Sequence, residues 1–421
     1  MENQNNFFSK EERAKLLSIF EDYQNKRKRA LFAHGLDYEN YRQNLREIKE
    51  ETILHSKALR EKAIRSLKEN GVNVFWAEDA QKARNIIDKI LFDKKIIVKA
   101  KSNCFNEINQ SGFLSDKEIT ETDIGDFIVK LVEKEGIHPV LPSLHITSED
   151  IIRAIEKKFN QKISNNKKDV VDFISAFLRT KIVEADAAIT GANVITADGH
   201  IVILENEGNI SLISRLPKTH IIVSGFEKIV NDLSEAMDLV RGSSIWGTGQ
   251  YFPSYVSVIS GPSKTADIEN EIILGAQGAE EVNLILIDNG RTQLISHGLS
   301  ELLYCLNCGA CLNFCPVFHQ IGAAYGYRYP GSRGVIFSAF SDSFEKAKEA
   351  NCFSCTLCSA CHENCPVKID LPRLMEKTRY YLTEKGIQTN ANEEMIEKVR
   401  KYGNPFGEVK KGETPDQLYC C

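Results

Sequence analysis

Two copies of one cysteine motif carry the clearest chemistry in this sequence. The segments CLNCGACLNFCP and CTLCSACHENCP, which begin at Cys305 and Cys355, both read C-x2-C-x2-C-x3-C-P. Three thiolates at this spacing can bind three corners of one cubane, because a tight loop turns successive side chains inward and points its amide N–H groups at the sulfurs. Cysteine zinc sites typically use separated C-x2-C pairs instead. The motifs therefore predict two [4Fe–4S] clusters.

The fourth cysteine of each motif is expected to bind the other cluster, because its x3 spacing directs it away from its own loop, as in two-cluster ferredoxins. Cluster 1 is then held by Cys305, Cys308, Cys311 and Cys365, and cluster 2 by Cys355, Cys358, Cys361 and Cys315. A register shifted to begin at Cys352 would leave Cys361 spare. It fits less well, because Cys361 stands at the x3 spacing from Cys365.

The other cysteines are interpreted as structural. Cys352 is expected to be a spare buried thiol and Cys104 a small core residue. Cys420 and Cys421 end the sequence and are interpreted as part of a tail, with a redox or metal-binding pair as the alternative.

The cysteine loops need a scaffold, and the sequence predicts a helical one. Forty positions separate Cys315 from Cys355, which leaves room for helices between the two loops. Helical patterns also cover residues 344–350, 371–384 and 393–402. We therefore expect a mostly helical dicluster ferredoxin domain.

Upstream of the motifs the pattern is that of an α/β protein. Its first seventy residues are charged and helical in period. Short apolar runs then alternate with helical segments, which indicates crossover connections and a largely parallel sheet. Strands are predicted at residues 72–76, 96–99, 140–141, 187–189, 201–204, 221–223, 256–259 and 284–287. The predicted division is a helical extension (1–70), an α/β domain (71–297), the ferredoxin domain (298–390) and a carboxyl-terminal tail (391–421).

Polar residues gather near the predicted strand ends of the α/β domain. ITGAN at residues 189–193 could form a backbone nest for an anion, and VILENEGN at 202–209 places two carboxylates near each other. Paired carboxylates can support acid–base chemistry. A ligand pocket is predicted from Gly191, Asn193, Glu205, Glu207 and His220, with loop caps and solvated strand ends as the alternative interpretation.

Composition narrows the function classes. The net charge is −5 and the pI is about 6.1, which gives no basic field for nucleic acid. No run approaches the roughly 20 apolar residues of a membrane span, and the amino-terminal residues lack a signal-peptide core. Neither G-x-G-x-x-G after a strand nor a P-loop occurs, so we expect no NAD or ATP site. The sequence predicts a cytoplasmic protein whose clusters exchange electrons with another subunit.

Several α/β segments resemble the LUD domain family. They are KAKSN (99–103), ETDIGDFI (121–128), PSLH (142–145), ADAAITGANVITADGHIVILENEGN (185–209), LPKTH (216–220), SGPSKTADIE (260–269) and ILIDNGR (285–291). Together with the cysteine motifs and the AYGYRYPG connector, the sequence resembles the iron–sulfur, B-type proteins of lactate utilisation. The resemblance implies an isomerase- and CoA-transferase-like α/β domain followed by a ferredoxin module.

The same resemblance implies an electron-transfer subunit of a complex that oxidises L-lactate to pyruvate. Its implied partners are a cysteine-rich-domain subunit, a second LUD subunit, and a downstream carrier or quinone, through which the complex could associate with a membrane. YGNPFG at residues 402–407 resembles a linker of heterodisulfide-reductase-like proteins. Two alternatives therefore stay open: a heterodisulfide-reductase-like electron-transfer module, and a LUD domain that itself binds an organic acid catalytically.

Overall fold

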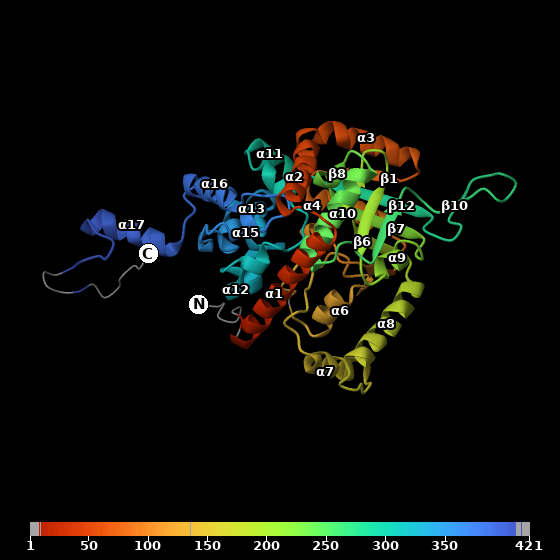
Figure 1. Ribbon diagram of the computed structural model, residues 1–421, viewed down its shortest axis with the longest axis horizontal. Helices are drawn as coiled ribbons and strands as arrows, with labels where there is room; N and C mark the ends of the chain where they lie inside the picture. The colour runs from red at the N-terminus through yellow and green to blue at the C-terminus, as the bar shows by residue number, and fades with distance from the viewer. Residues whose placement is uncertain (1–7, 9, 135, 410–413, 415–421) are drawn as a thin grey trace.

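The computed structural model describes residues 8, 10–134, 136–409 and 414. Cys420 and Cys421 lie outside these residues. An N-terminal group of helices comprises α1 (Lys10–Ala33), α2 (Tyr38–Leu54) and α3 (Ser56–Glu69). Figure 1 shows the main sheet on one side of the molecule and the helices that follow the cysteine loops on the other, with α1 and α2 close to both.

The main sheet has six strands, and every neighbouring pair is parallel. Its spatial order is β1 (Asn73–Ala77), β12 (Glu281–Ile287), β7 (Thr219–Gly225), β4 (Ala187–Gly191), β2 (Ile96–Lys99) and β3 (Glu118–Glu121). All seven residues of β7 are buried. Apolar strands buried on both faces are typical of parallel sheets covered by helices, and the predicted α/β fold with a largely parallel sheet is confirmed.

A second sheet of four strands lies beside the first. It runs in the order β8 (Ile229–Val230), β5 (Val194–Thr196), β6 (Ile201–Glu205) and β9 (Tyr255–Ile259). The β5–β6 and β6–β9 pairs are antiparallel. Strands 201–204 and 256–259 were predicted correctly but belong to this sheet, because a short β5–β6 turn cannot make a parallel crossover. Residues 140–141 form no strand, which corrects that prediction.

The helices that pack on the main sheet include α4 (Ala80–Ile90), α5 (Asn103–Ile108) and α9 (Asn209–Ile213). The helix α10 (Leu233–Thr248) packs on β5 of the second sheet, and α11 (Arg291–Ser296) packs toward the residues after 298. A further lobe is formed by α6 (Ile124–Leu131), α7 (Ser148–Phe159) and α8 (Lys167–Glu184). The lobe has its own apolar cluster, which includes Phe127, Ile155 and Ile174. Capping fixes where α4 begins, because the Asp79 carboxylate accepts a hydrogen bond from the Lys82 amide at 2.8 Å.

The residues after 298 are mostly helical, as predicted. Their helices are α12 (Phe318–Ile321), α13 (Gly331–Ser341), α14 (Phe344–Glu349), α15 (Ala360–Glu363), α16 (Leu371–Glu384) and α17 (Asn390–Tyr402). This part also contains a short hairpin of β13 (Gly326–Tyr327) and β14 (Tyr329–Pro330). A second short hairpin, of β10 (Lys264–Thr265) and β11 (Ile273–Leu274), belongs to the preceding α/β part. None of the residues of α17 is buried, and Figure 1 shows this helix extending from the body of the molecule.

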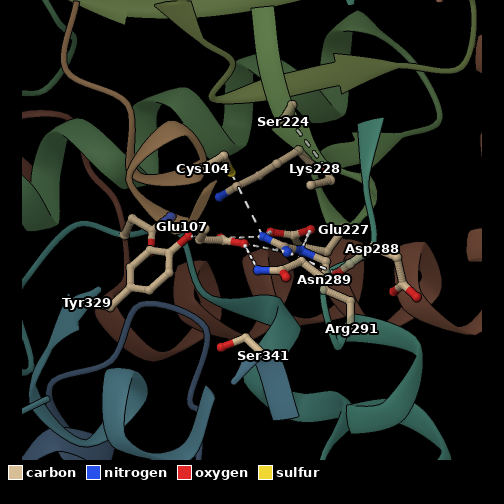
Figure 2. Close-up of polar contacts among 12 residues, drawn as sticks. Cys104, Glu107, Ser224, Glu227, Lys228, Asp288, Asn289, Arg291, Tyr329 and Ser341 are labelled. Carbon is tan, nitrogen blue, oxygen red and sulfur yellow. Dashed lines mark hydrogen bonds and ion pairs between the residues drawn. The ribbon is translucent and has the colours of Figure 1, made fainter. Parts of the chain in front are cut away.

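A buried charge cluster joins the main sheet to the cysteine-bearing part (Figure 2). The fully buried Arg291 guanidinium donates to Glu107 at 2.6 and 2.8 Å and to Glu227 at 2.5 Å. Tyr329, from the connector between the two motifs, donates its hydroxyl to Glu107. Burial opposes ionisation of Glu227, but the Arg291 charge lowers the pKa of Glu227 to about 2. The cluster therefore holds ionised groups together across the junction.

Removing the cation should expose how much this junction depends on it. Arg291→Met leaves Glu107 and Glu227 as buried, unpaired carboxylates, so we expect a loss of about 3–5 kcal/mol in the free energy of unfolding. The measurement is denaturant unfolding of the anoxically purified chain.

A matched control is Arg153→Met. The Arg153 side chain is 73% exposed and pairs with Asp150 at 2.6 Å, so its loss should cost no more than about 1 kcal/mol. Equal destabilisation by the two substitutions would show that the buried pairs do not hold the junction.

Candidate metal centre and adjoining cavity

The two cysteine loops share an unusual backbone. Asn307 and Leu357, two residues after the first cysteine of each motif, have φ of 58° and 57°. Gly309 and Ser359, one residue after the second cysteine, have φ of 78° and 63°. Left-handed residues are uncommon outside glycine, so their recurrence at matching positions shows that both loops make the same turn. This turn brings the first three thiols of each motif to one side.

Backbone amides point at the sulfurs. The Asn307 amide donates to Cys305 Sγ at 3.4 Å, and the Phe318 amide donates to Cys315 Sγ at 3.5 Å. Hydrogen bonds from amides stabilise thiolates and tune the potential of a cluster that they bind. The Gly309 position is closed on its outer side, because a Cβ there would lie 2.7 Å from the His138 ring.

The eight motif cysteines fall into two electrostatic neighbourhoods, which meet where Cys361 of the second lies close enough to act on Cys311 of the first. Burial, followed by the charges of Cys305, Cys308, Cys361 and Cys365, raises the pKa of Cys311 well above its ordinary value. In the second neighbourhood, burial and then the charges of Cys315, Cys355 and Cys358 raise the pKa of Cys361 to about 12. Burial is the main cause that raises the pKa values of Cys365 and Cys315. The charge of Cys305 also raises the pKa of Cys365, and the charges of Cys355 and Cys358 raise that of Cys315. Each neighbourhood thus contains the Cys-Pro cysteine of the opposite motif.

These raised pKa values make bare thiolates costly, and cationic metal would remove that cost. Within the described part of the chain, no three His, Cys, Asp or Glu side chains are arranged to hold a single metal ion. In a cubane, by contrast, each thiolate binds a different iron. The donor set fits iron–sulfur clusters, whose thiolates need burial, amide donors and an overall counter-charge.

Buried cations surround the first neighbourhood. Arg42 donates to the Cys365 carbonyl at 2.8 Å, and Lys228 donates to the Cys305 carbonyl at 3.3 Å. Arg333 is 7% exposed, stacks on the Tyr329 ring at 3.4 Å and feels the charge of Cys305. Its Nε and Nη1 have no hydrogen-bond partner among the described residues. A buried guanidinium needs nearby negative charge. Glu107 supplies part of it, and a thiolate-bound cluster would add to it.

The second neighbourhood is less enclosed. Arg379 donates to the Cys355 carbonyl at 2.7 Å, and the Cys358 side chain is exposed. In contrast, Cys308 is packed between the loop and the main domain, where burial raises its pKa to about 12. A cluster held by the second set would therefore lie nearer the surface than one held by the first.

Cys352 is fully buried and lies against Met375, with the two sulfurs 3.6 Å apart. Its carbonyl accepts from Arg379 at 2.9 Å. Cys104 is also buried, and Arg291 Nη2 approaches its sulfur at 3.9 Å. Both contacts are those of packed core residues.

A cavity of about 250 Å³ lies where the main domain meets the first cysteine loop. Its walls come from residues 101–104 after β2, 191–193 at the end of β4, 205–207 after β6, the α10 residues Ser243 and Ser244, and loop residues 306–308. Because strands β2, β4 and β7 are parallel, their carboxyl ends meet at one edge, which is where α/β proteins bind ligands.

The cavity contains four of the five predicted pocket residues. Gly191, Asn193, Glu205 and Glu207 line it, whereas His220 does not. His220 is fully buried near the other end of β7, where its Nε2 lies 2.8 Å from Thr190 Oγ1. Burial lowers the pKa of His220 to about 3, so the ring is a neutral core residue. His220 stands at the amino end of β7, and in a parallel sheet this end lies at the edge opposite the cavity.

Sequence reasoning missed the cavity's other polar residues. Among them, Lys101 and Ser102 come from one segment, and Lys228 and Ser244 from two others. KAKSN offered a usable signal, since Lys101 and Ser102 directly follow a predicted strand. Lys228 and Ser244 could be found only from the packing of α10 and β7 against the cysteine loop.

Two protein families match separate parts of the chain. Residues 60–287 match the LUD domain family, and residues 301–369 match the family described as the 4Fe-4S dicluster domain. None of the helices in the described ranges has the length and apolar character to cross a bilayer.

Among curated proteins, "Lactate utilization protein B" of Bacillus velezensis is 33% identical over 87% of this chain and 77% of its own length. Proteins with the same name from Bacillus subtilis and Shouchella clausii are 34% and 32% identical, over 78% and 90% of this chain and 68% and 84% of their own. With this identity over most of both chains, the protein belongs to the lactate utilization protein B family, and its dicluster domain implies iron–sulfur clusters and electron transfer.

Proposed function

We propose that this chain is the electron-transfer subunit of a multi-subunit complex that oxidises L-lactate to pyruvate, with electrons passing through two [4Fe–4S] clusters. The observation that supports the proposal most is that each cysteine triplet contains thiols close enough to interact electrostatically with the Cys-Pro cysteine of the other motif. Cluster 1 is assigned to Cys305, Cys308, Cys311 and Cys365, and cluster 2 to Cys355, Cys358, Cys361 and Cys315. The proposed domains are 1–70, 71–297, 298–390 and 391–421.

The two sets of cysteines differ in burial, and this difference gives the proposed electron route an inner end and an outer end. The cluster 1 cysteines lie against the main domain and its cavity, whereas Cys358 of cluster 2 is exposed. One end of the route is then enclosed by this chain and the other is open to a partner. Fe–S centres move single electrons, and oxidation of lactate to pyruvate releases two electrons and two protons, so two clusters suit the task.

The proposed partners are a cysteine-rich-domain subunit and a second LUD subunit in the cytoplasm. A quinone or another carrier is the final acceptor, and through it the complex associates with the membrane. Support comes from the family of the chain and from the exposed cluster 2 loop. The chain's own residues hold the clusters, shield cluster 1 from water and set its electrostatic surroundings through Arg42, Lys228 and Arg333.

The assignment of cluster ligands can be tested by replacing single cysteines with serine. Cys361→Ser removes an assigned corner of cluster 2 and should abolish or convert one cluster, seen as a loss of iron and of one EPR signal in the reduced protein. Cys352→Ser changes only a sulfur packed on Met375, so both clusters should remain. The two cysteines lie within ten residues of each other, which makes them a matched pair. Cluster loss in the Cys352 variant, with Cys361→Ser intact, would overturn the assignment.

The electron-transfer role can be tested with the native complex. Purified anoxically and alone, the chain should show two clusters that dithionite reduces but L-lactate does not, because no hydride-accepting cofactor motif occurs in its sequence. L-lactate should reduce the same clusters once the partner subunits are present, as followed by EPR. Lactate-driven reduction of the isolated chain would contradict the proposal, as would clusters that stay oxidised in the active complex.

A further inference from the structure

The cavity beside the first cysteine loop has hydrogen-bond acceptors that are already occupied. The Glu205 carboxylate is 4% exposed and accepts from the Ile210 and Ser211 amides at 2.7 and 2.8 Å. Glu207 accepts from the Ile124 amide at 2.9 Å. These carboxylates fix the loops around the cavity and are not free to bind a cationic ligand.

Asp123, the third carboxyl group of the lining, is also engaged. It accepts from the Lys101 amide at 2.5 Å. Burial, and then the charge of Asp126, raises the pKa of Asp123 to about 7, so the group carries only part of a negative charge at neutral pH. The lining is therefore less acidic than its sequence indicates.

Three polar groups on residues that line the cavity lack hydrogen-bond partners among the described residues. Ser244 Oγ has no partner, and Lys101 Nζ has no hydrogen bond but forms an ion pair with Asp126, whose carboxylate oxygen is 3.6 Å away. Ser244 is only 4% exposed. Asn209 Oδ1 is an unpartnered acceptor at 7% exposure on the same lining. Buried polar atoms are rarely left unsatisfied, so these three side chains indicate a polar occupant.

Their chemistry specifies the occupant. An ammonium and a hydroxyl donate to a carboxylate, and a free amide oxygen accepts from a hydroxyl. The volume of about 250 Å³ exceeds the 150 Å³ or so that holds a benzene molecule and falls short of drug-sized pockets. A small acid with a neighbouring hydroxyl offers each of the three groups a partner of the right kind.

The occupant would lie against the first cysteine loop. Cys308 forms part of the wall, and Lys228 lines the cavity while donating to the Cys305 carbonyl. On the facing helix, Gly247 leaves no side chain in between, since a Cβ there would lie 3.5 Å from the Cys308 carbonyl oxygen. Cys104 and Lys228, two residues of the cavity wall, lie on the same side of the charge cluster in Figure 2.

We propose that this cavity binds a small 2-hydroxy acid as its anion, with the carboxylate held by Lys101 and Ser244 and the hydroxyl by Asn209. The choice of L-lactate as the acid rests on the proposed function, whereas the anion site does not. The site places a metabolite next to cluster 1 and gives the LUD domain a ligand-sensing or ligand-positioning role.

The test is isothermal titration of the anoxically purified, cluster-loaded full chain with L-lactate. We expect saturable binding that Lys101→Met weakens roughly tenfold or more, because a charged hydrogen bond is lost. Ser244→Ala should weaken it about two- to tenfold. Lys218→Met is the matched control, since Lys218 is 85% exposed and lies outside the cavity. Propionate, which lacks the hydroxyl, should bind more weakly than lactate.

A second readout locates the ligand. Reduction of cluster 1 makes it paramagnetic, so ¹³C-lactate in the cavity should relax faster with the reduced chain than with the oxidised chain. Thermal melting and the EPR spectrum of each variant establish that it is folded and loaded, and Ser244→Ala serves if Lys101→Met fails to fold.

Absence of saturable binding, or equal binding by the Lys101, Ser244 and Lys218 variants, would overturn the site. So would binding without the relaxation effect, since it would place lactate elsewhere. In each of those cases the clusters could still accept electrons in the native complex, so the proposed function would stand. Binding as predicted, together with clusters that stay oxidised in the active complex, would retain the site and remove the proposed function.

Discussion

The buried pairing of Arg291 with Glu107 and Glu227 is the interaction on which the arrangement of the two halves depends. Its carboxylates come from the LUD domain and its guanidinium follows the last strand of the main sheet, while Tyr329 reaches in from between the cysteine motifs. An ionised group this deeply buried tolerates little displacement. The cluster therefore holds Tyr329 of the connector against the main domain, and Lys228, next to Glu227, contacts the first cysteine loop beside the cavity.

Charge also explains why the amino-terminal helix α2 packs against the cysteine-bearing part of the chain. A thiolate-bound cluster is negative, and its surroundings must supply positive charge or amide donors. Arg42 and Arg46 of α2 donate to the carbonyls of Cys365 and Lys368, and Arg46 pairs with Glu301 at 3.0 Å. Arg333 and Lys228 add cations from the other side. The helical extension is thus part of the wall around the metal centre, and its charged sequence reflects a contact that only the fold reveals.

Local features were predictable from the sequence, and features made by distant residues were not. Motif spacing predicted two equivalent loops, and the matched φ values of Asn307 and Leu357 show the same turn in both. Alternation of strands and helices predicted the parallel sheet. The second sheet was missed because a period of two does not say which strand a neighbour pairs with. The sequence did not indicate that Arg291 and Lys228 are buried, since a single charged residue looks the same in a sequence whether it is solvated or buried.

Mössbauer spectroscopy of the anoxically purified, ⁵⁷Fe-labelled chain, combined with iron and sulfide determination, tests the central claim that two interlocked cubanes occupy these loops. The account predicts two four-iron clusters per chain, with sulfide equal to iron and two distinguishable environments, because cluster 1 is enclosed by buried cations and cluster 2 lies near the exposed Cys358. Zinc in the cysteine loops, or iron sufficient for a single cluster, would contradict it.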